Sequence, residues 1–505
     1  KAGESRVVKF DASTHPSLKL KNPRLWWPKG YGAPYLYPVE LSIKTGDGKI
    51  SDSHRYMSGV REMTFTENEG ILNMYINGRR FIGRGGNWGF PESNLNYRAR
   101  EYDIAVSYHA NMNFTMIRNW VGQTGDDAFY EACDRHGIMI WQDFWLANPA
   151  DGPDPADPEM FMSNARDMVK RIRNHPSVGL YCGRNEGNPP VVLDTALRSL
   201  ITRQHPDLHY ISHSSEGVVS GGGPYRALPP RDYYLLYGFN RFHSERGMPN
   251  VMSYESMVQT LPENALWPQN SQWGLHDYCL EGAQAAASFN EIIEKAFGPS
   301  HDAKEFTELA QWINYDGYRA IFEGRSLHRQ GMLLWMSHPA WPSMVWQTYD
   351  YYFDPTAAYF GCKKANEPIH IQWNPVFHDI EVVNYHAGNR KDLTASAMMM
   401  NMDGSVQWQK ECKISIGEDS TVTCFRLEFP ESLSEVFFIK LILRAGDRII
   451  SDNFYWKGKE DGNFRALRQM PGADVSHETK VVKTAEGWSL VTKLKNNSGH
   501  PALMV

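Results

Sequence analysis

The stretch that decides the fold of this chain is Tyr181-Cys-Gly-Arg-Asn-Glu-Gly-Asn-Pro-Pro190. It continues an apolar run that begins at Val178, and its Asn-Glu pair stands directly before a break rich in Gly and Pro. A buried strand that ends in a carboxylate and a turn is typical of a (β/α)8 barrel, in which polar residues after the strands gather at one open end. The run Phe242-His-Ser-Glu-Arg-Gly247 repeats this order. The two runs predict that Glu186 and Glu245 share the mouth of a parallel barrel.

Between about residues 66 and 370 the chain alternates strand and helix signals, which is typical of βα units. Helices are expected at Asp126–His136 and Met160–Arg173. The eight strand candidates are Phe81–Trp88, Phe114–Trp120, Gly137–Phe144, Val178–Glu186, His209–Ser214, Tyr233–Tyr237, Arg241–Glu245 and Met332–Met336. Eight strands predict a TIM barrel. A doubly wound sheet is the alternative, but no Gly-x-Gly-x-x-Gly follows a strand, so dinucleotide chemistry has no support.

The flanking segments have strand-like alternation and turn signals instead. We expect a partial immunoglobulin-like β-sandwich at 1–65, the barrel as catalytic domain at 66–370, and an immunoglobulin-like β-sandwich at 371–465. Residues 466–505 are interpreted as the start of a further β-sandwich or a C-terminal extension. The chain begins at Lys1 without Met or a signal peptide, so we expect a fragment or a processed product. The sequence leaves the localisation unknown, and a periplasmic or secreted location is favoured.

The composition narrows the class of protein. The 505 residues carry a net charge of −6, which argues against a nucleic-acid surface. No apolar run reaches 18 residues, so no membrane insertion is expected. The six cysteines have no CxxC spacing, and no metal site is predicted. A disulfide between Cys412 and Cys424 is conceivable. The aromatic content of 13% is explained by core packing or, in part, by carbohydrate binding.

The barrel motifs resemble glycoside hydrolase family 2 over roughly residues 20 to 460. They are Gly85-Gly-Asn-Trp88, Met116-Ile-Arg-Asn-Trp120, Ile140-Trp-Gln-Asp143, Arg173-Asn-His-Pro-Ser177, Asn185-Glu186, Ser244-Glu-Arg-Gly247, Gly331-Met-Leu-Leu-Trp335 and the run from Gly361 to His370. Lys363-Lys-Ala-Asn-Glu-Pro368 and Gly223-Pro-Tyr225 look similar to exo-β-D-glucosaminidases, whereas the two Glu motifs fit β-mannosidases and endo-β-mannosidases equally well. Two departures stand out: exo-glucosaminidases can carry Asp where this chain has Glu186, and the family's N-terminal sugar-binding-like sandwich is missing.

Two glutamates at one barrel mouth are what a retaining glycosidase needs. We expect Glu186 to be the general acid/base, which calls for burial or a nearby negative charge, and Glu245 to be the nucleophile. Glu255 competes for the nucleophile's role but is better interpreted as the start of a helix. The resemblance implies that Arg118 hydrogen-bonds the nucleophile. Asn185 is expected to bind the 2-substituent of the sugar.

A wider set of residues is expected at the same mouth, with four of the seven touching substrate. They are Asn87, Trp88, Trp120, Asp143, His213, Tyr237 and Trp335. Trp335 resembles the aromatic platform beneath the bound sugar. Glu92 is a candidate for binding a substrate ammonium group, with a surface loop charge as the alternative. The acidic, proline-rich loop from Asp151 to Glu159 is interpreted as a stiff lid or spacer, because it lacks the ligand spacing of a calcium loop.

The sequence thus predicts a retaining glycoside hydrolase that cleaves terminal β-glucosaminides or β-mannosides through a covalent glycosyl-enzyme, with a glycan as its partner and no cofactor. An endo-β-mannosidase, another family 2 β-glycosidase of the β-galactosidase or β-glucuronidase type, and a non-catalytic carbohydrate-binding relic of the fold remain as alternatives. Sugar, linkage and oligomeric state do not follow from the sequence.

Overall fold

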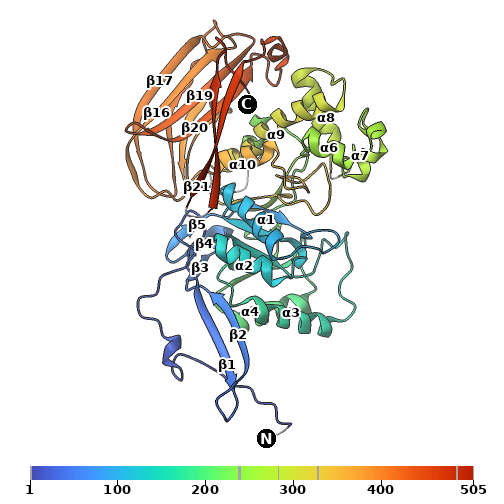
Figure 1. Ribbon diagram of the computed structural model, residues 1–505, viewed down its shortest axis with the longest axis vertical. Coiled ribbons are helices and arrows are strands. Elements are labelled where there is room, and N and C mark those ends of the chain that lie inside the picture. Colours follow the sequence, from blue (N-terminus) through green and yellow to red (C-terminus); the bar gives the residue numbers. More distant parts are fainter. Residues whose placement is uncertain (1–2, 237–239, 283, 327–328, 485–486, 504–505) are drawn as a thin grey trace.

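The structure is a computed structural model. It describes residues 3–503 apart from 237–239, 283, 327–328 and 485–486. A barrel occupies the middle of the molecule (Figure 1). A β-sandwich lies at one end of the barrel, and the hairpin of β1 (Tyr37–Lys44) and β2 (Ile50–Ser58) extends from the other end.

Eight parallel strands form one sheet in the order β10-β9-β8-β7-β6-β13-β12-β11. They are β6 (Arg84–Trp88), β7 (Met116–Asn119), β8 (Met139–Asp143), β9 (Val178–Arg184), β10 (His209–His213), β11 (Val219–Ser220), β12 (Phe242–Arg246) and β13 (Met332–Leu334). The first strand, β6, pairs with the last, β13, as in a closed barrel. Within the described residues, backbone pairing is missing only between the neighbouring edges β10 and β11. The predicted barrel fold is confirmed.

Burial on both faces explains why these segments form a parallel barrel. Every residue of β6, β7, β8, β9 and β12 is buried, which is the pattern of strands with a packed interior and a helical cover. Gly85 is required by close packing: a Cβ at this position would lie 1.7 Å from the carbonyl oxygen of Met116 on β7. Only a residue without a side chain lets β6 and β7 approach to this distance.

Helices follow most of the strands. They are α1 (Ala99–Asn111), α2 (Asp127–His136), α3 (Pro158–Ile172), α4 (Val191–Gln204), α5 (Pro230–Leu235), α6 (Tyr254–Thr260), α7 (Ser271–Leu275), α8 (Ala286–Phe297), α9 (Ala303–Ser326) and α10 (Ala357–Ala365). Both predicted helices are found, as α2 and α3. The helix α2 ends where Gly137 takes a φ of 72°, and α3 begins where the Asp157 carboxylate accepts the Met160 N–H.

One strand prediction is wrong. The sixth barrel strand is β11, whereas the segment expected to be a strand around Tyr233 is the helix α5. Pro230 stands at the start of this helix, where its fixed φ favours helical backbone. The aromatic run of Tyr233 and Tyr234 was a misleading strand signal. Tyr237, a predicted site residue, lies outside the described residues.

After the barrel, the chain forms two antiparallel sheets, β14-β15-β18 and β17-β16-β19-β20, that enclose a separate apolar core. Their strands are β14 (Ile369–Asn374), β15 (Asp379–Asn384), β16 (Arg390–Asn401), β17 (Val406–Ile416), β18 (Ser420–Arg426), β19 (Val436–Ala445) and β20 (Arg448–Gly458). Two such sheets packed face to face make a β-sandwich. Cys412 and Cys424 are free thiols, so a disulfide between them is not formed.

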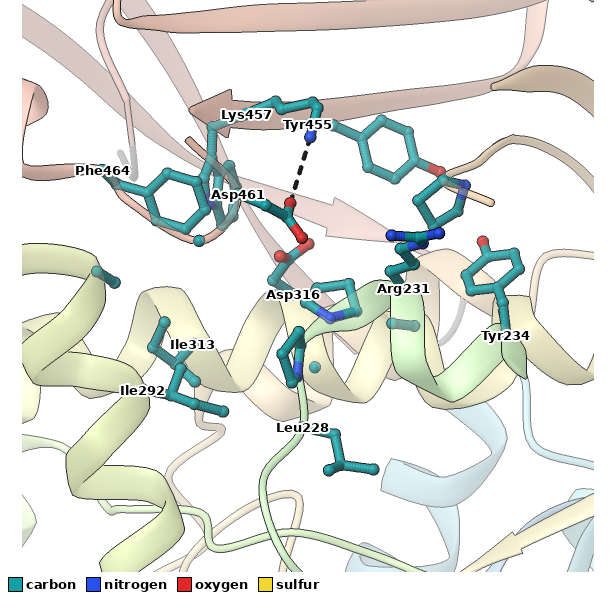
Figure 2. A pocket seen from close by; sticks show the side chains of 18 of the residues that line it. Leu228, Arg231, Tyr234, Ile292, Ile313, Asp316, Tyr455, Lys457, Asp461 and Phe464 are labelled. Atoms are coloured by element: carbon teal, nitrogen blue, oxygen red, sulfur yellow. Dashed lines mark hydrogen bonds and ion pairs between the residues drawn. The ribbon is translucent and has the colours of Figure 1, made fainter. Parts of the chain in front are cut away.

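A buried polar network joins the barrel to the sandwich. Arg319 of α9 donates to the carbonyl oxygen of Phe454 on β20 at 2.6 Å and to Asp316 at 2.5 Å. Beside it, Asp316 lines a pocket between the two domains (Figure 2), whose apolar side includes Ile313 and Phe464. The network and the pocket walls come from both domains, so the domains share one packed junction.

Smaller sheets complete the structure. The strands β3 (Met63–Thr66), β4 (Asn73–Ile76) and β5 (Arg79–Phe81) precede the barrel, and β21 (Val475–Thr484) pairs with β22 (Gly487–Asn496) near the C-terminal end. Short 3-10 helices lie at Pro16–Leu18, Asn68–Gly70, Trp120–Gly122, Glu263–Ala265 and Arg465–Gln469. Across the described part of the chain, the helices are too short or too polar to cross a bilayer.

Candidate active site

The two glutamates occupy the carboxyl ends of barrel strands. Glu186 follows β9 by two residues and has a left-handed backbone, with φ at 46°. Its N–H donates to the Ser214 hydroxyl at 3.1 Å, which helps to hold this unusual backbone in place. Glu245 lies within β12 and is only 2% exposed. Glu186 is half-buried, so one carboxylate is accessible to water and the other is enclosed.

The Tyr225 hydroxyl lies between the two carboxylates. It donates to Glu245 Oε2 at 2.6 Å and lies 3.5 Å from Glu186 Oε1. These two carboxylate oxygens are therefore no further apart than the two distances together, about 6.1 Å. Retaining glycosidases hold their carboxyl groups about 5–5.5 Å apart, and inverting enzymes about 6.5–9.5 Å. The separation favours the retaining arrangement.

Arg118, at 0% exposure, connects the residues of the site. Its Nη1 donates to Glu245 Oε1 at 2.6 Å, and its Nη2 donates to Asp143 at 2.7 Å and to Asn185 Oδ1 at 2.8 Å. A planar guanidinium with several donors can fix three neighbours at once. Asp143 also accepts the Val121 N–H at 3.0 Å. This bond holds the Asp143 carboxylate in place, and the carboxylate in turn orients the Arg118 guanidinium.

The surroundings set the ionisation of Glu245. Burial raises the pKa of the Glu245 carboxyl, the Arg118 guanidinium opposes this, and the negative charge of Glu186 adds to it. Burial likewise raises the pKa of the Tyr225 hydroxyl, and the Glu245 charge beside it does so further. Tyr225 therefore remains a hydrogen-bond donor at neutral pH. The charge of Arg118 is what makes an ionised Glu245 tolerable in this enclosed place.

Asn185 is oriented by its two acceptor contacts. Its Oδ1 accepts from Arg118 Nη2 at 2.8 Å and from the Ser214 hydroxyl at 3.1 Å. With the carbonyl end occupied, the Nδ2 group is the end of the amide that can donate to a ligand.

Aromatic rings form one wall of the mouth. The Trp335 ring lies 5.0 Å from Trp120, 6.2 Å from Tyr225 and 5.9 Å from Trp346, measured between ring centroids. Trp335 and Trp120 are only partly buried. A partly exposed indole beside two carboxylates offers an apolar face to the C–H surface of a sugar.

Several residues expected to touch substrate have partners within the protein instead. Trp88 is fully buried and stacks on His338 at 3.9 Å, so it belongs to the core. Asn87 is also fully buried, and its Nδ2 donates to the carbonyl oxygens of residues 244 and 334, which ties β12 to β13. The Nδ1 atom of His213 accepts the N–H groups of residues 215 and 216. Asp143 supports Arg118 from within the barrel.

Two other acidic candidates also have local partners. Glu92 is 4% exposed, and its carboxylate accepts two backbone N–H groups of its own loop and the Tyr351 hydroxyl. Glu92 is therefore not a surface loop charge, and its binding of a substrate ammonium group stays a prediction. Glu255 lies in the first turn of α6 with Ser253 as N-cap, as the sequence predicted.

Sequence reasoning missed three residues of the site. Tyr225 and Trp346 follow no predicted strand, and Asn148, whose Nδ2 donates to Glu186 Oε2 at 3.1 Å, stands in a loop. Of these, only Tyr225 carried a signal, because it lies in the motif Gly223-Pro-Tyr225. Loop residues have no periodicity that would place them, so the other two could not be found.

Comparisons with known proteins show which proteins this chain is similar to. The family model of glycosyl hydrolases family 2 matches residues 1–61. The chain is 29% identical to a mannosylglycoprotein endo-β-mannosidase of Lilium longiflorum and 27% identical to an exo-β-D-glucosaminidase of Streptomyces avermitilis, in each case over 90% of this chain. It spans 54% of the length of each of these two relatives.

Solved structures share the fold. The β-D-mannosidase of Dictyoglomus thermophilum matches with a TM-score of 0.81 and 25% identity, over 95% of this chain and 62% of that one. An exo-chitosanase of Amycolatopsis orientalis matches with a TM-score of 0.85 at 23% identity, over 95% and 63%. In these comparisons the chain is similar to family 2 glycosyl hydrolases, and the relatives that it matches include β-mannosidases and exo-β-D-glucosaminidases.

Proposed function

We propose that this chain is the catalytic part of a retaining β-glycosidase that removes terminal β-glucosaminyl or β-mannosyl residues. The observation that carries the proposal is the pair of carboxylates, Glu186 just after β9 and Glu245 on β12, which lie within about 6.1 Å of each other across the Tyr225 hydroxyl. The names of the relatives support both sugars.

The reaction follows from the positions of the two carboxylates. The Glu245 carboxylate attacks the anomeric carbon, while Glu186 gives its proton to the departing glycosidic oxygen, and a glycosyl ester of Glu245 forms. Glu186, now ionised, takes a proton from water, and the resulting hydroxide displaces Glu245 from the anomeric carbon. Two inversions leave the product with the configuration of the substrate.

Other residues of the site assist by orientation. Arg118 holds one oxygen of Glu245, which leaves the nucleophile in one rotamer and favours its ionised form. The free amide end of Asn185 is placed to bind the sugar's 2-substituent, where contacts strengthen in an oxocarbenium-like transition state. Mannose and glucosamine differ at this carbon, by an axial hydroxyl and an amine, so a site that hydrogen-bonds one can reject the other strongly.

The test is hydrolysis of five aryl β-glycosides, the mannoside, glucosaminide, galactoside, glucuronide and glucoside. We expect a clear preference for one of the first two, with retention of configuration by NMR. Glu245→Gln, which is nearly isosteric, should abolish turnover while the protein stays folded. Glu186→Ala should still form the glycosyl-enzyme from substrates with good leaving groups. Substantial activity in Glu245→Gln would refute the nucleophile assignment.

Endo-β-mannosidase activity is a second candidate, which the match to the Lilium longiflorum enzyme favours. It differs from exo action in its products, because an endo enzyme releases an oligosaccharide and an exo enzyme releases a single sugar. Digestion of a mannosylated glycan with mass analysis of the products separates the two. A folded protein that binds the glycan without cleaving it would point instead to a carbohydrate-binding relic.

A further inference from the structure

The loop between β8 and α3, residues 144–157, is tied to the strand that carries the acid/base. The Asn185 N–H donates to the Leu146 carbonyl oxygen at 2.9 Å. The Arg184 side chain, 4% exposed, donates to the Ala147 carbonyl oxygen at 2.8 Å and to Asp154 at 2.6 Å. Three bonds from Arg184, the last residue of β9, and from Asn185 directly after it therefore fix this loop immediately beside Glu186.

Asn148 is the residue of this loop that reaches the acid/base. Its Nδ2 donates to Glu186 Oε2 at 3.1 Å, while its Oδ1 accepts the Ala150 N–H at 2.9 Å. The second bond settles the orientation of the amide, because only the carbonyl end can accept a backbone N–H. The donor end is thus directed at the carboxylate by the loop itself.

The two oxygens of Glu186 consequently differ. Oε2 accepts the Asn148 amide, whereas Oε1 lies 3.5 Å from the Tyr225 hydroxyl, which already donates to Glu245. Oε1 also borders Gly222, where an added Cβ would lie 3.5 Å from it. Oε1 is therefore the oxygen on the side of the nucleophile, with space beside it that a side chain would fill.

We propose that Asn148 is a positioning residue that holds Glu186 Oε2 and thereby assigns Oε1 as the oxygen that carries the transferred proton. This rests on the proposed glycosidase function. A carboxyl oxygen that accepts an N–H keeps its lone pair for that bond, so the acid proton stands on the other oxygen. The bond is compatible with both states of Glu186, since Oε2 accepts as a carbonyl oxygen in the acid and as a carboxylate oxygen in the base.

The test compares two substrates whose leaving groups differ in their need for a proton. In Asn148→Ala, kcat/KM for an alkyl β-glycoside, which needs the proton, should fall about ten- to a hundredfold, the worth of a hydrogen bond to a charged group. For a dinitrophenyl β-glycoside of the same sugar, whose leaving group departs without protonation, kcat/KM should change less than about threefold. A merely structural role of Asn148 would lower both values together.

Two further variants keep the experiment decisive. Asn148→Asp keeps the shape and the acceptor for Ala150 but puts a carboxylate oxygen where the donor stood, so Glu186 Oε2 loses its N–H and faces a negative charge. It should show the same split between substrates even if the alanine variant folds poorly. Asp154→Asn weakens the anchor of the loop and leaves the Asn148 amide in place, and it should affect both substrates alike. Circular dichroism and thermal unfolding check that each variant is folded.

The outcomes separate this inference from the proposed function. If the wild type hydrolyses neither glycoside, or if Glu245→Gln stays active, the proposed function fails and the role of Asn148 falls with it. If the wild type is active and Glu245→Gln is inactive, the proposed function stands. The inference about Asn148 is then overturned if both Asn148 variants lose the same activity on the two substrates, or if they lose activity on neither substrate.

Discussion

At the residue scale, Glu245 lies where burial resists its ionisation, and the Tyr225 hydroxyl is one of the groups that favour it. Burial raises the pKa of Glu245, while Arg118 and the hydrogen bond from Tyr225 lower it. In Tyr225→Phe the bond is lost, so the pKa of Glu245 should rise. Because Glu245 must be ionised to act as the proposed nucleophile, the acidic limb of the kcat/KM–pH profile should move to higher pH, with roughly tenfold lower kcat/KM at neutral pH.

Tyr351→Phe is the matched control, because it removes the same hydroxyl from a tyrosine that donates to Glu92 and not to Glu186 or Glu245. Its profile should keep the wild-type acidic limb. An unchanged limb in Tyr225→Phe would mean that the hydroxyl does not influence the ionisation of Glu245.

The residues of the candidate site show which side-chain positions a sequence can predict and which it cannot. Glu186, Glu245, Asn185 and Arg118 end or follow strands, and the carboxyl ends of parallel strands must meet at one face, so their proximity could be predicted. Trp88 has the same position in its strand but is fully buried, since a strand end can direct a side chain to the helical layer as well as to the mouth. The sequence pattern does not distinguish these two directions.

At the element scale, a strand that is buried on both faces appears in the sequence as a run of apolar residues, and such runs predict the barrel. The strand β11 has only two residues and therefore no apolar run. Its place in the sheet is set by pairing with β12, which is a tertiary effect. An aromatic-rich helix, α5, was therefore mistaken for the missing strand. The seven longer strands could be predicted without knowledge of their pairing, because their own residues have the strand pattern.

The contact between β6 and β7 offers a test at this scale. Gly85→Ala would place a Cβ 1.7 Å from the Met116 carbonyl oxygen, so the two strands would have to separate. We expect the free energy of unfolding to fall by about 3 kcal/mol or more, measured by urea titration. Gly125→Ala is the control, because nothing lies within 4 Å of a Cβ there. Equal stability of the two variants would show that the barrel accommodates the clash.

At the scale of the whole molecule, the barrel and the sandwich are joined by a buried charge network that responds to pH. His370 of β14 lies 2.9 Å from Glu323 of α9 and 3.2 Å from Glu367. Burial alone would lower the pKa of His370, but the hydrogen bonds to Glu323 and Glu367 outweigh it and raise the pKa above 6.5. The histidine is therefore charged at the junction under conditions in which an exposed imidazole loses its proton.

A raised histidine pKa stabilises the fold most at pH values below that of the unfolded chain, about 6.5, and this contribution disappears as the pH rises through the folded value. His370→Asn, which removes the charge beside Glu323, should therefore cost about 3 kcal/mol at pH 6. The difference from the wild type should shrink steadily above neutral pH in urea unfolding. His477→Asn, on the exposed strand β21, should match the wild type throughout. A gap that stays constant with pH would mean that His370 contributes by packing, and that the charge at the junction has no role in holding the two domains together.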